Sequence, residues 1–244
     1  EGAAVWPGRR GAANDDAPDG AHVCRAFEDV APANVRVVVL GQDPYPSVAQ
    51  ATGRAFEDGA WEGGRPQGIA KSLKPLMLAA LATQNGRAGL FRAGSWPEVR
   101  RLIRGGHLAL PELDGYFDAL AGQGVLFVNA AWTHTRTSDV GVHLTLWRPV
   151  LRHFLRKSAR DAQAPLLFVL LGRKAQARFA ASGAEAEARL AETWDNRVVR
   201  VDLPHPRDSE FFGQNPWLHV NQLLLELNAQ PIDWWPPLPA AAPA

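Results

Sequence analysis

The chain is poor in cysteine and has no long apolar run. It has one cysteine, Cys24, among 244 residues. A single thiol excludes an internal disulfide, a cysteine-rich zinc site and a cysteine-ligated iron–sulfur cluster, and it indicates a reducing compartment. No apolar run is long enough to span a bilayer, and residues 1–20 lack a signal-peptide pattern. We therefore expect a cytoplasmic protein with no membrane partner.

An excess of charge of one sign is also missing. Lys and Arg number 26 against 25 for Asp and Glu, so the net charge is +1, and any attraction to phosphate must come from local clusters of cations. Aromatic residues, in contrast, are plentiful, and nine Trp and 10 Phe supply apolar area for a folded core. Length and composition favour one domain over 21–235, with a flexible leader over 1–20 and a Pro/Ala-rich tail over 236–244. The sequence does not encode the oligomeric state, and a monomer is the default expectation.

Apolar runs alternate with helical patterns along the domain. Four runs, each stopped by a turn residue, are typical of strands buried on both faces of a parallel sheet, and they span 35–40, 125–128, 166–171 and 198–203. Apolar stripes at helical spacing predict helices over 72–83, with Ser72 as N-cap, and over 113–120, 146–155, 173–179 and 217–227. This alternation predicts a three-layer α/β/α fold with a central, mainly parallel four-stranded sheet.

Polar residues follow the predicted strands at the points where they end. Gln42 and Asp43 follow the first strand, Asn129 the second, Arg173 the third and His205 the fourth. In open α/β sheets, ligands bind at the carboxyl ends of the strands. The spacing alone therefore predicts a site formed by these residues.

The segment after the first predicted strand reads Gly-Gln-Asp-Pro-Tyr-Pro over residues 41–46. An isolated Asp-Pro pair in this place favours a simple tight turn. This hexapeptide, however, resembles the water-activating loop of family 1 uracil-DNA glycosylases, whose pattern is Gly-Gln-Asp-Pro-Tyr-His. Further segments resemble the family's motifs in the same order along the chain, so that the resemblance extends over residues 27–234. The matching segments are 50–56, 72–74, 124–130, 171–176, 205–206, 211–213, 221–224 and 231–234.

The resemblance implies a DNA repair enzyme that hydrolyses the bond between uracil and deoxyribose, needs no metal or cofactor, and leaves an abasic site. In the transition state, positive charge grows on the sugar and negative charge on the departing base. We expect Asp43 to hold the attacking water and to offset the sugar charge. We expect a neutral His205 to donate a hydrogen bond to uracil O2. A lone histidine is more often structural, as we expect of His22, His107, His153 and His219.

Four residues are implied in recognising the base. Asn129 carries an amide donor and acceptor for uracil O4 and N3–H, although an asparagine at a strand end is equally typical of a turn. Phe56 offers a face for stacking, although ordinary core packing explains an isolated phenylalanine as well. Tyr45 is implied in rejecting the methyl group of thymine, and Gln42 in contacting the base through its backbone.

The target base must leave the DNA helix before it is cut. Contacts to the flanking phosphates offset part of that cost, and solvated surface charge is the alternative for each cation. The candidates for DNA contacts are Lys71, Ser72, Lys74, Arg173, Lys174 and Arg207. The low cysteine count and the absent signal peptide indicate the cytoplasm or nucleoid, and the excess of Arg over Lys, with high Ala content, favours a bacterial source.

The sequence departs from the family pattern in three places. Pro46 stands where the family has His, and residues 68–71 replace a Pro-rich loop. The third departure is the loop from His205 to Phe211, which is short and lacks the intercalating Leu, so that Arg207 is the candidate to fill the vacated position by stacking. We therefore expect poor flipping from duplex DNA and a preference for single-stranded or weakly paired uracil. A proteinaceous inhibitor docking on this loop stays open as a further partner.

Three alternatives compete with this interpretation. The first is a non-catalytic module that binds uracil or a lesion on the same fold, and the presence of both Asp43 and His205 argues against it. The second is an enzyme acting on small nucleotides, which would need a phosphate-binding Gly-rich loop that follows none of the strands. The third is a glycosylase of another base preference, which Tyr45 and Asn129 disfavour.

Overall fold

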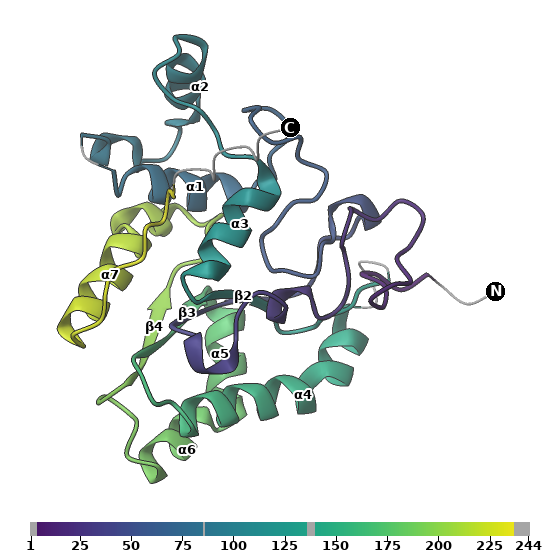
Figure 1. Cartoon of the computed structure of the whole chain (residues 1–244), viewed down its shortest axis with the longest axis vertical. Coiled ribbons are helices and arrows are strands. Elements are labelled where there is room, and N and C mark those ends of the chain that lie inside the picture. Colours follow the sequence, from purple (N-terminus) through teal and green to yellow (C-terminus); the bar gives the residue numbers. More distant parts are fainter. Residues whose placement is uncertain (1–3, 85, 136–139, 237–244) are drawn as a thin grey trace.

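A four-stranded parallel sheet forms the centre of the molecule. The computed structural model describes residues 4–84, 86–135 and 140–236. The strands are β1 (Val37–Gly41), β2 (Val125–Asn129), β3 (Leu166–Leu171) and β4 (Val198–Leu203), in the order β2-β1-β3-β4 (Figure 1). All three pairings are parallel, which confirms the sheet predicted from the apolar runs.

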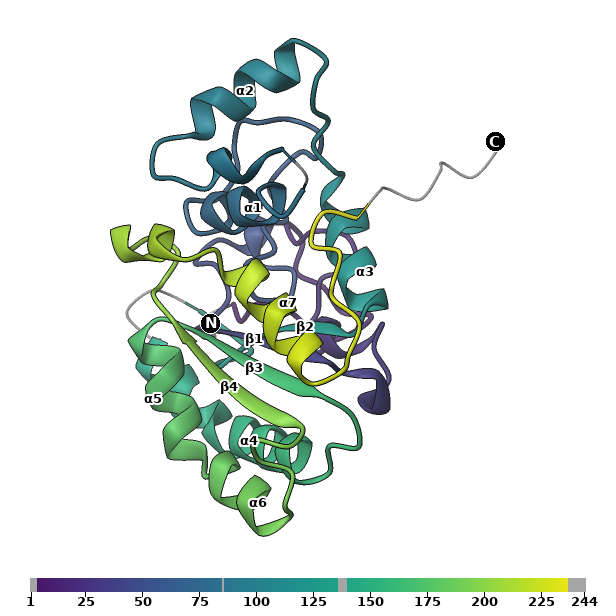
Figure 2. The ribbon, with the colours of Figure 1, turned by 90° about the vertical axis from the view of Figure 1, so that its left-hand side faces the viewer.

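Helices cover both faces of this sheet, which confirms the three-layer prediction (Figure 2). One face carries α1 (Leu73–Leu81), α3 (Leu113–Gly122) and α7 (Pro216–Glu226). The other face carries α4 (Val140–Arg160), α5 (Arg173–Ser182) and α6 (Ala184–Leu190), and α2 (Trp96–Arg104) stands beyond α1 at one end of the molecule. Short 3-10 helices span Arg25–Phe27 (η1), Pro32–Asn34 (η2), Val48–Gln50 (η3), Ala88–Leu90 (η4) and Ser209–Gly213 (η6).

The side chains of β1 alternate between two cores. Val37 and Val39 pack with residues of α1, α3 and α7, whereas Val38 and Leu40 pack with residues of α4, α5 and α6. Successive side chains of a strand point to opposite faces, and both faces of this strand are covered by helices. This is why the run is apolar throughout instead of alternating with polar residues.

Several helices differ from the prediction. α4 starts earlier and ends later than the predicted 146–155, because its buried side chains occupy only part of its length and the rest of the helix is exposed. α2 and α6 were not predicted. α2 is short and packs on a separate small core instead of on the sheet, and α6 follows Gly183, whose left-handed backbone separates it from α5.

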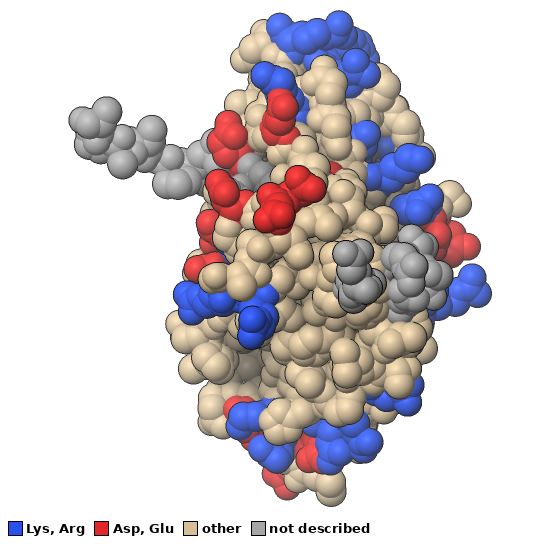
Figure 3. Space-filling model, turned by 90° about the vertical axis from the view of Figure 1, so that its right-hand side faces the viewer, with Lys and Arg blue, Asp and Glu red and all other residues tan. Residues whose placement is uncertain are grey.

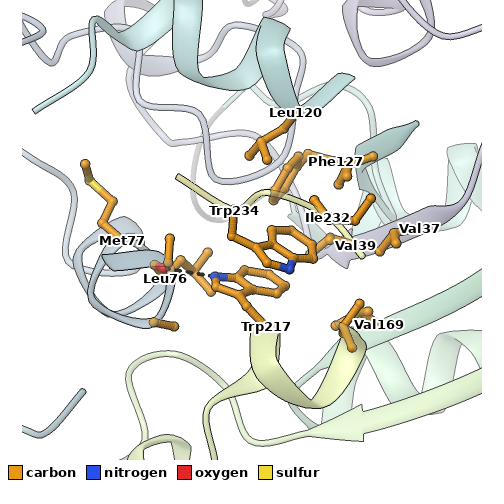
Figure 4. Packing of buried hydrophobic residues seen from close by; sticks show 14 of the residues in the cluster. Val37, Val39, Leu76, Met77, Leu120, Phe127, Val169, Trp217, Ile232 and Trp234 are labelled. Atoms are coloured by element: carbon orange, nitrogen blue, oxygen red, sulfur yellow. Dashed lines mark hydrogen bonds between the residues drawn. The ribbon is translucent and has the colours of Figure 1, made fainter. Parts of the chain in front are cut away.

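The C-terminal segment is fastened to α7 by aromatic stacking (Figure 4). The rings of Trp217 and Trp234 are stacked with centroids 4.0 Å apart, and both side chains are fully buried. Trp217 Nε1 donates to the carbonyl of Leu76 in α1 at 3.0 Å. The Asn221 side chain accepts from Ile232 N and donates to Ile232 O, each at 2.9 Å. Trp217 therefore ties α7 to α1, and the C-terminal segment packs on α7 through Trp234 and Ile232.

Part of the expected flexible leader packs on the domain. Trp6 is 8% exposed and forms an isolated antiparallel bridge with His134. Its Nε1 donates to the carbonyl of Tyr45 at 2.9 Å. The leader prediction rested on composition, which does not register a single anchoring indole. Residues 1–3 of that leader and 237–244 of the predicted tail lie outside the described residues, and no helix of the described chain is both long and apolar enough for a membrane span.

Candidate active site

The carboxyl ends of the strands border one cavity of about 500 Å³. Gly41 pairs with Asn129 in the register of β1 and β2, and Leu171 pairs with Leu203 in the register of β3 and β4. The residues that follow each strand therefore meet at one edge of the sheet. All the predicted site residues except Lys71 and Lys74 line this cavity: Gln42, Asp43, Tyr45, Phe56, Ser72, Asn129, Arg173, Lys174, His205 and Arg207.

Asp43 projects from the loop after β1 and is 17% exposed at the side chain. Burial raises the pKa of its carboxyl group, and the Gln42 amide, which donates to Oδ1 at 2.7 Å, acts in the opposite direction. His134 Nε2 lies 3.6 Å from the other carboxylate oxygen, Oδ2. One oxygen of Asp43 thus accepts from an amide, while the second faces an imidazole.

His205 lies half-buried just past the end of β4. Burial lowers the pKa of its imidazole, which favours the neutral ring. The backbone N–H of Arg207 donates to Nδ1 at 3.2 Å. A ring nitrogen that accepts a hydrogen bond carries no proton, so the neutral ring bears its proton on Nε2. The short turn after β4 therefore sets the tautomer that can donate a hydrogen bond.

Two glycines leave room for polar side chains of the cavity. Gly172 has φ +90°, and a Cβ on it would lie 2.8 Å from the Cβ of His205. A Cβ on Gly41 would lie 2.6 Å from Oδ1 of Asn129. Because real Cβ atoms do not approach that closely, neither His205 nor Asn129 could keep its place beside a larger residue.

Three residues form a wall suited to a flat, polar ring. Asn129 is 4% exposed. The Tyr45 hydroxyl donates to the carbonyl of Phe56 at 3.2 Å and lies 3.1 Å from Ser72 Oγ, and burial raises the pKa of the Tyr45 phenol, so that it stays protonated. Phe56 has φ +65°, a strained conformation for a residue with a Cβ, and such strain is concentrated at functional sites.

Cationic side chains surround the mouth of the cavity. Arg173 and Lys174 begin α5, and Arg207 is exposed in the turn after His205. Ser72 immediately precedes α1, but its side chain makes no capping hydrogen bond, because its hydroxyl pairs with Tyr45. The capping role predicted for Ser72 is therefore wrong. Lys71 and Lys74 flank Ser72 outside the cavity, and no three His, Cys, Asp or Glu side chains converge on a metal position within the described residues.

Sequence reasoning missed three residues near the site. His134 is 1% exposed and approaches Asp43, and Trp6 holds His134 from outside the predicted domain. Arg54 lines the cavity and is ion-paired with Glu57, Asp118 and Asp29. The location of His134, a few residues past the end of β2, was a usable signal.

Comparison with known protein families shows which superfamily the chain belongs to. A model of the uracil-DNA glycosylase superfamily matches residues 27–223. The chain belongs to this superfamily. Its relatives include the uracil-DNA glycosylase of Mycobacterium bovis strain BCG, which is 30% identical over 227 residues, 89% of this chain and 80% of the relative. Uracil-DNA glycosylase 1 of Streptomyces coelicolor is 28% identical over 222 residues, with the same coverage of 89% and 80%.

Solved structures named for the same activity share the fold. The UNG crystal structure from Nitratifractor salsuginis matches with a TM-score of 0.56 at 19% identity, covering 84% of this chain and 77% of that one. Mimivirus uracil-DNA glycosylase matches with a TM-score of 0.57 at 20% identity, covering 87% and 72%. These likenesses show that the α/β architecture described above is the one those structures have.

Proposed function

We propose that this chain is a uracil-DNA glycosylase of the family 1 type, which hydrolyses the N-glycosidic bond of deoxyuridine in DNA. The products are free uracil and an abasic site. The observation that carries the proposal is the presence of Asp43 and His205 in one cavity, together with Tyr45, Phe56 and Asn129. Membership of the superfamily and the names of the relatives support the same reaction.

In this mechanism Asp43 acts on the sugar side of the scissile bond. As the bond from C1′ to N1 breaks, its electrons leave with the base and positive charge develops on the sugar. The Asp43 carboxylate offsets that charge and orients a water, whose oxygen adds to C1′ while its proton passes to the carboxylate and then, through solvent, to the departed uracil anion. Gln42 and His134 fix the orientation of the carboxylate, because each faces one of its oxygens.

His205 acts on the other side, at the departing base. Uracil leaves with negative charge on O2, and a preorganised donor there stabilises the transition state more than the ground state. The Nε2 proton of a neutral imidazole is such a donor, and the Arg207 N–H on Nδ1 supports that tautomer. Removing one donor of this kind typically costs about 10²–10³-fold in kcat.

Three residues select uracil in this proposal. The buried Asn129 amide pairs with O4 and N3–H, and an unpaired buried amide would penalise a base with the opposite pattern. The Phe56 ring stacks on the base. Tyr45 stands against C5, where its two hydrogen-bonding neighbours, the Phe56 carbonyl and the Ser72 hydroxyl, keep it from yielding to a thymine methyl.

The decisive experiment is an excision assay on a uracil-containing oligonucleotide, with a chelator present and no metal added. We expect the wild type to release uracil and Asp43→Asn to lose about 10²–10⁴-fold in rate. Asp208→Asn is the matched control, because Asp208 is a second carboxylate of the same cavity that is exposed at its mouth. An inactive wild type, or Asp43→Asn at the wild-type rate, would sink the proposal and favour a binding module.

We propose further that the enzyme prefers single-stranded uracil. The turn after His205 is tight, since Asp208 N donates to His205 O at 2.8 Å, and it carries Arg207 and Asp208 instead of an aliphatic wedge. Unpairing a base costs a few kcal/mol, so an enzyme whose turn after His205 carries no aliphatic wedge gains most from an unpaired target. Comparing kcat/KM on single-stranded and duplex oligonucleotides tests this, and faster cleavage of the duplex would contradict it.

DNA contacts complete the proposal. The phosphates on either side of the flipped nucleotide are held by polar and basic side chains around the cavity. Those at the cavity are Ser72, Arg173, Lys174 and Arg207, and those beside it are Lys71 and Lys74. The enzyme acts as a monomer in the bacterial cytoplasm, on the DNA of the nucleoid.

A further inference from the structure

Positive charge is concentrated at the end of the molecule that carries α2. Residues 84–111 contain the five arginines Arg87, Arg92, Arg100, Arg101 and Arg104 and only one acidic residue, Glu98, whereas the whole chain has a net charge of +1. Figure 3 shows Lys and Arg atoms gathered over α2 at the top of the molecule, while acidic atoms lie lower on this face. The catalytic cavity does not account for this charge, because none of these arginines lines it.

α2 presents an apolar side to the protein and a basic side to solvent. Val99 is fully buried, and Trp96, Leu102 and Ile103 pack with the small core that α2 shares with α1. Arg100, Arg101 and Arg104 are exposed. Residues three and four positions apart are neighbours on a helix surface, so these three guanidinium groups form one patch, which we call the α2 basic face.

The charge of the α2 basic face is available to a ligand. Glu98 is ion-paired with Arg92, and none of the three arginines has a carboxylate partner within the part of the chain that the structure describes. α4 provides a partial contrast, because two of its arginines are neutralised: Arg156 pairs with Glu187 and Arg160 with Asp161.

α2 is tied to the rim of the catalytic cavity. Trp96, at the start of α2, donates from Nε1 to the carbonyl of Pro66 at 3.0 Å. Residue 66 belongs to the loop that leads into Lys71 and Ser72, and Ser72 lines the cavity. A single strand carries one phosphate per about 3.4 Å along a DNA helix, so a strand of about 25 nucleotides that occupies the cavity extends well beyond its rim.

We infer that the α2 basic face is a second DNA-binding surface, which contacts phosphates several nucleotides away from the flipped uracil. This inference rests on the proposed function, because the substrate of the cavity is then a polyanion long enough to reach α2. Charge complementarity favours this ligand. The contacts are electrostatic and independent of sequence, so they lengthen the footprint on DNA without changing the chemistry in the cavity.

The test measures binding separately from excision. The variant is the triple substitution Arg100→Gln, Arg101→Gln, Arg104→Gln, and binding of uracil-free single-stranded DNA of about 25 nucleotides is followed by fluorescence anisotropy against salt concentration. Each neutralised phosphate contributes about 0.7 to the slope of log K against log salt, so the slope should become shallower by about 2. Between 50 and 200 mM salt, affinity of the wild type should then fall about fifteen-fold more than affinity of the variant.

Two matched variants separate location from net charge and from folding. Arg148→Gln, Arg152→Gln, Arg156→Gln removes the same charge from α4, on the other face of the sheet, and should leave the slope near the wild-type value. Arg100→Lys, Arg101→Lys, Arg104→Lys keeps the charge of α2 and should also retain the slope. Equal slopes for the α2 and α4 triple glutamine variants, or an α2 variant identical to wild type, would overturn the inference.

Excision gives an independent readout. On a uracil oligonucleotide of about five nucleotides, which fills only the cavity, the α2 glutamine variant should keep the kcat and KM of the wild type. On a 25-nucleotide substrate its KM should rise severalfold at unchanged kcat. Loss of excision by the wild type itself would sink the proposed function while leaving the salt slopes to decide the α2 basic face. If the α2 basic face instead binds an acidic protein, every variant should show the wild-type salt dependence of DNA binding.

Discussion

Burial acts on the two proposed catalytic residues in chemically opposite directions. It raises the pKa of Asp43, so that carboxyl takes up its proton at a higher pH than usual as the solution is acidified. It lowers the pKa of His205, so that ring stays neutral to a lower pH than usual. The reaction needs an ionised Asp43 and a neutral His205. Activity should therefore be full at neutral pH and should be lost as the pH falls, because Asp43 and His205 both become protonated in acid.

The acid side of the pH profile of kcat/KM, which we call the acid limb, can be shifted by replacing Gln42, whose amide contacts Asp43. Gln42→Leu removes the amide donor that lowers the Asp43 pKa, so that pKa should rise and kcat/KM should begin to fall at a higher pH than in the wild type. A series of kcat/KM values from about pH 4 to 8 measures the shift. Gln50→Leu is the control, since Gln50 donates to Asp58 in the same manner away from the cavity. A limb that moves equally in both variants would contradict the assignment.

A second prediction at the scale of single residues concerns Gly172, which leaves room for His205. Gly172→Ala places a methyl group 2.8 Å from the Cβ of His205, at a backbone φ of +90°. We expect His205 to shift and kcat to fall tenfold or more, because displacing a reacting group by about 1 Å can cost about 10²-fold. Rates of uracil release and the free energy of unfolding are measured together.

Gly183→Ala is the matched control for that prediction. Gly183 also has a left-handed φ, +77°, but an added Cβ meets nothing within 4 Å. Both alanine variants should therefore lose stability from the backbone conformation alone, about 1 kcal/mol at Gly183 and more at Gly172, whose φ of +90° and ψ of 161° lie in a region that glycine almost alone adopts. Only the Gly172 variant should lose activity, and a comparable rate loss in the Gly183 variant would show that stability, not the position of His205, sets the rate.

The elements of the sheet were predictable from sequence, whereas several helices were not. β1, β2 and β3 are fully buried apolar runs, so their pattern is unmistakable. β4 carries Arg200 and Asp202 between its buried valines and leucine, so its signal is weaker. α2 lies away from the sheet, and its apolar side, which includes Trp96, Val99 and Ile103, covers only a small separate core, so the stripe is too short to stand out from its arginines. The site followed from the strands, because their ends place Asp43, Asn129 and His205 at one edge.

The fastening of α7 leads to a prediction about stability. Trp234→Ala removes a fully buried ring that is stacked on Trp217, and it also removes the donor to Asn221 Oδ1. Loss of a buried aromatic ring costs about 3–5 kcal/mol, and urea denaturation measures it. Trp235→Ala, next in the chain and only partly buried, should cost clearly less. Equal losses would mean that the stacked pair is not what holds α7.

At the scale of the whole molecule, three segments that are far apart in the sequence meet around Trp6. The carbonyl of Tyr45, after β1, accepts from the Trp6 indole, and His134, after β2, exchanges two backbone hydrogen bonds with Trp6 at 2.9 and 2.6 Å. Sequence patterns describe one segment at a time, so this link was invisible to them. Composition marked residues 1–20 as a leader because Gly, Ala and Asp outweigh one tryptophan.

Trp6 should therefore influence catalysis without touching the substrate cavity. Trp6→Ala removes the support of the Tyr45 carbonyl and of the ring beside His134, whose Nε2 lies 3.6 Å from Asp43. We expect kcat to fall about tenfold, less than on direct loss of Asp43, because the catalytic groups are displaced and not removed. Trp6→Phe keeps a ring against His134 but has no donor for Tyr45, so it should lie between the alanine variant and the wild type.

Trp194→Ala provides the comparison, because that partly buried indole sits at the far pole, against Phe179 of α5. Rates are taken at a temperature where thermal denaturation shows every variant folded. If Trp6→Ala and Trp194→Ala lose activity in proportion to their loss of stability, Trp6 is only a packing residue. If Trp6→Ala alone loses kcat, the N-terminal segment is part of what holds the water-binding carboxylate in place.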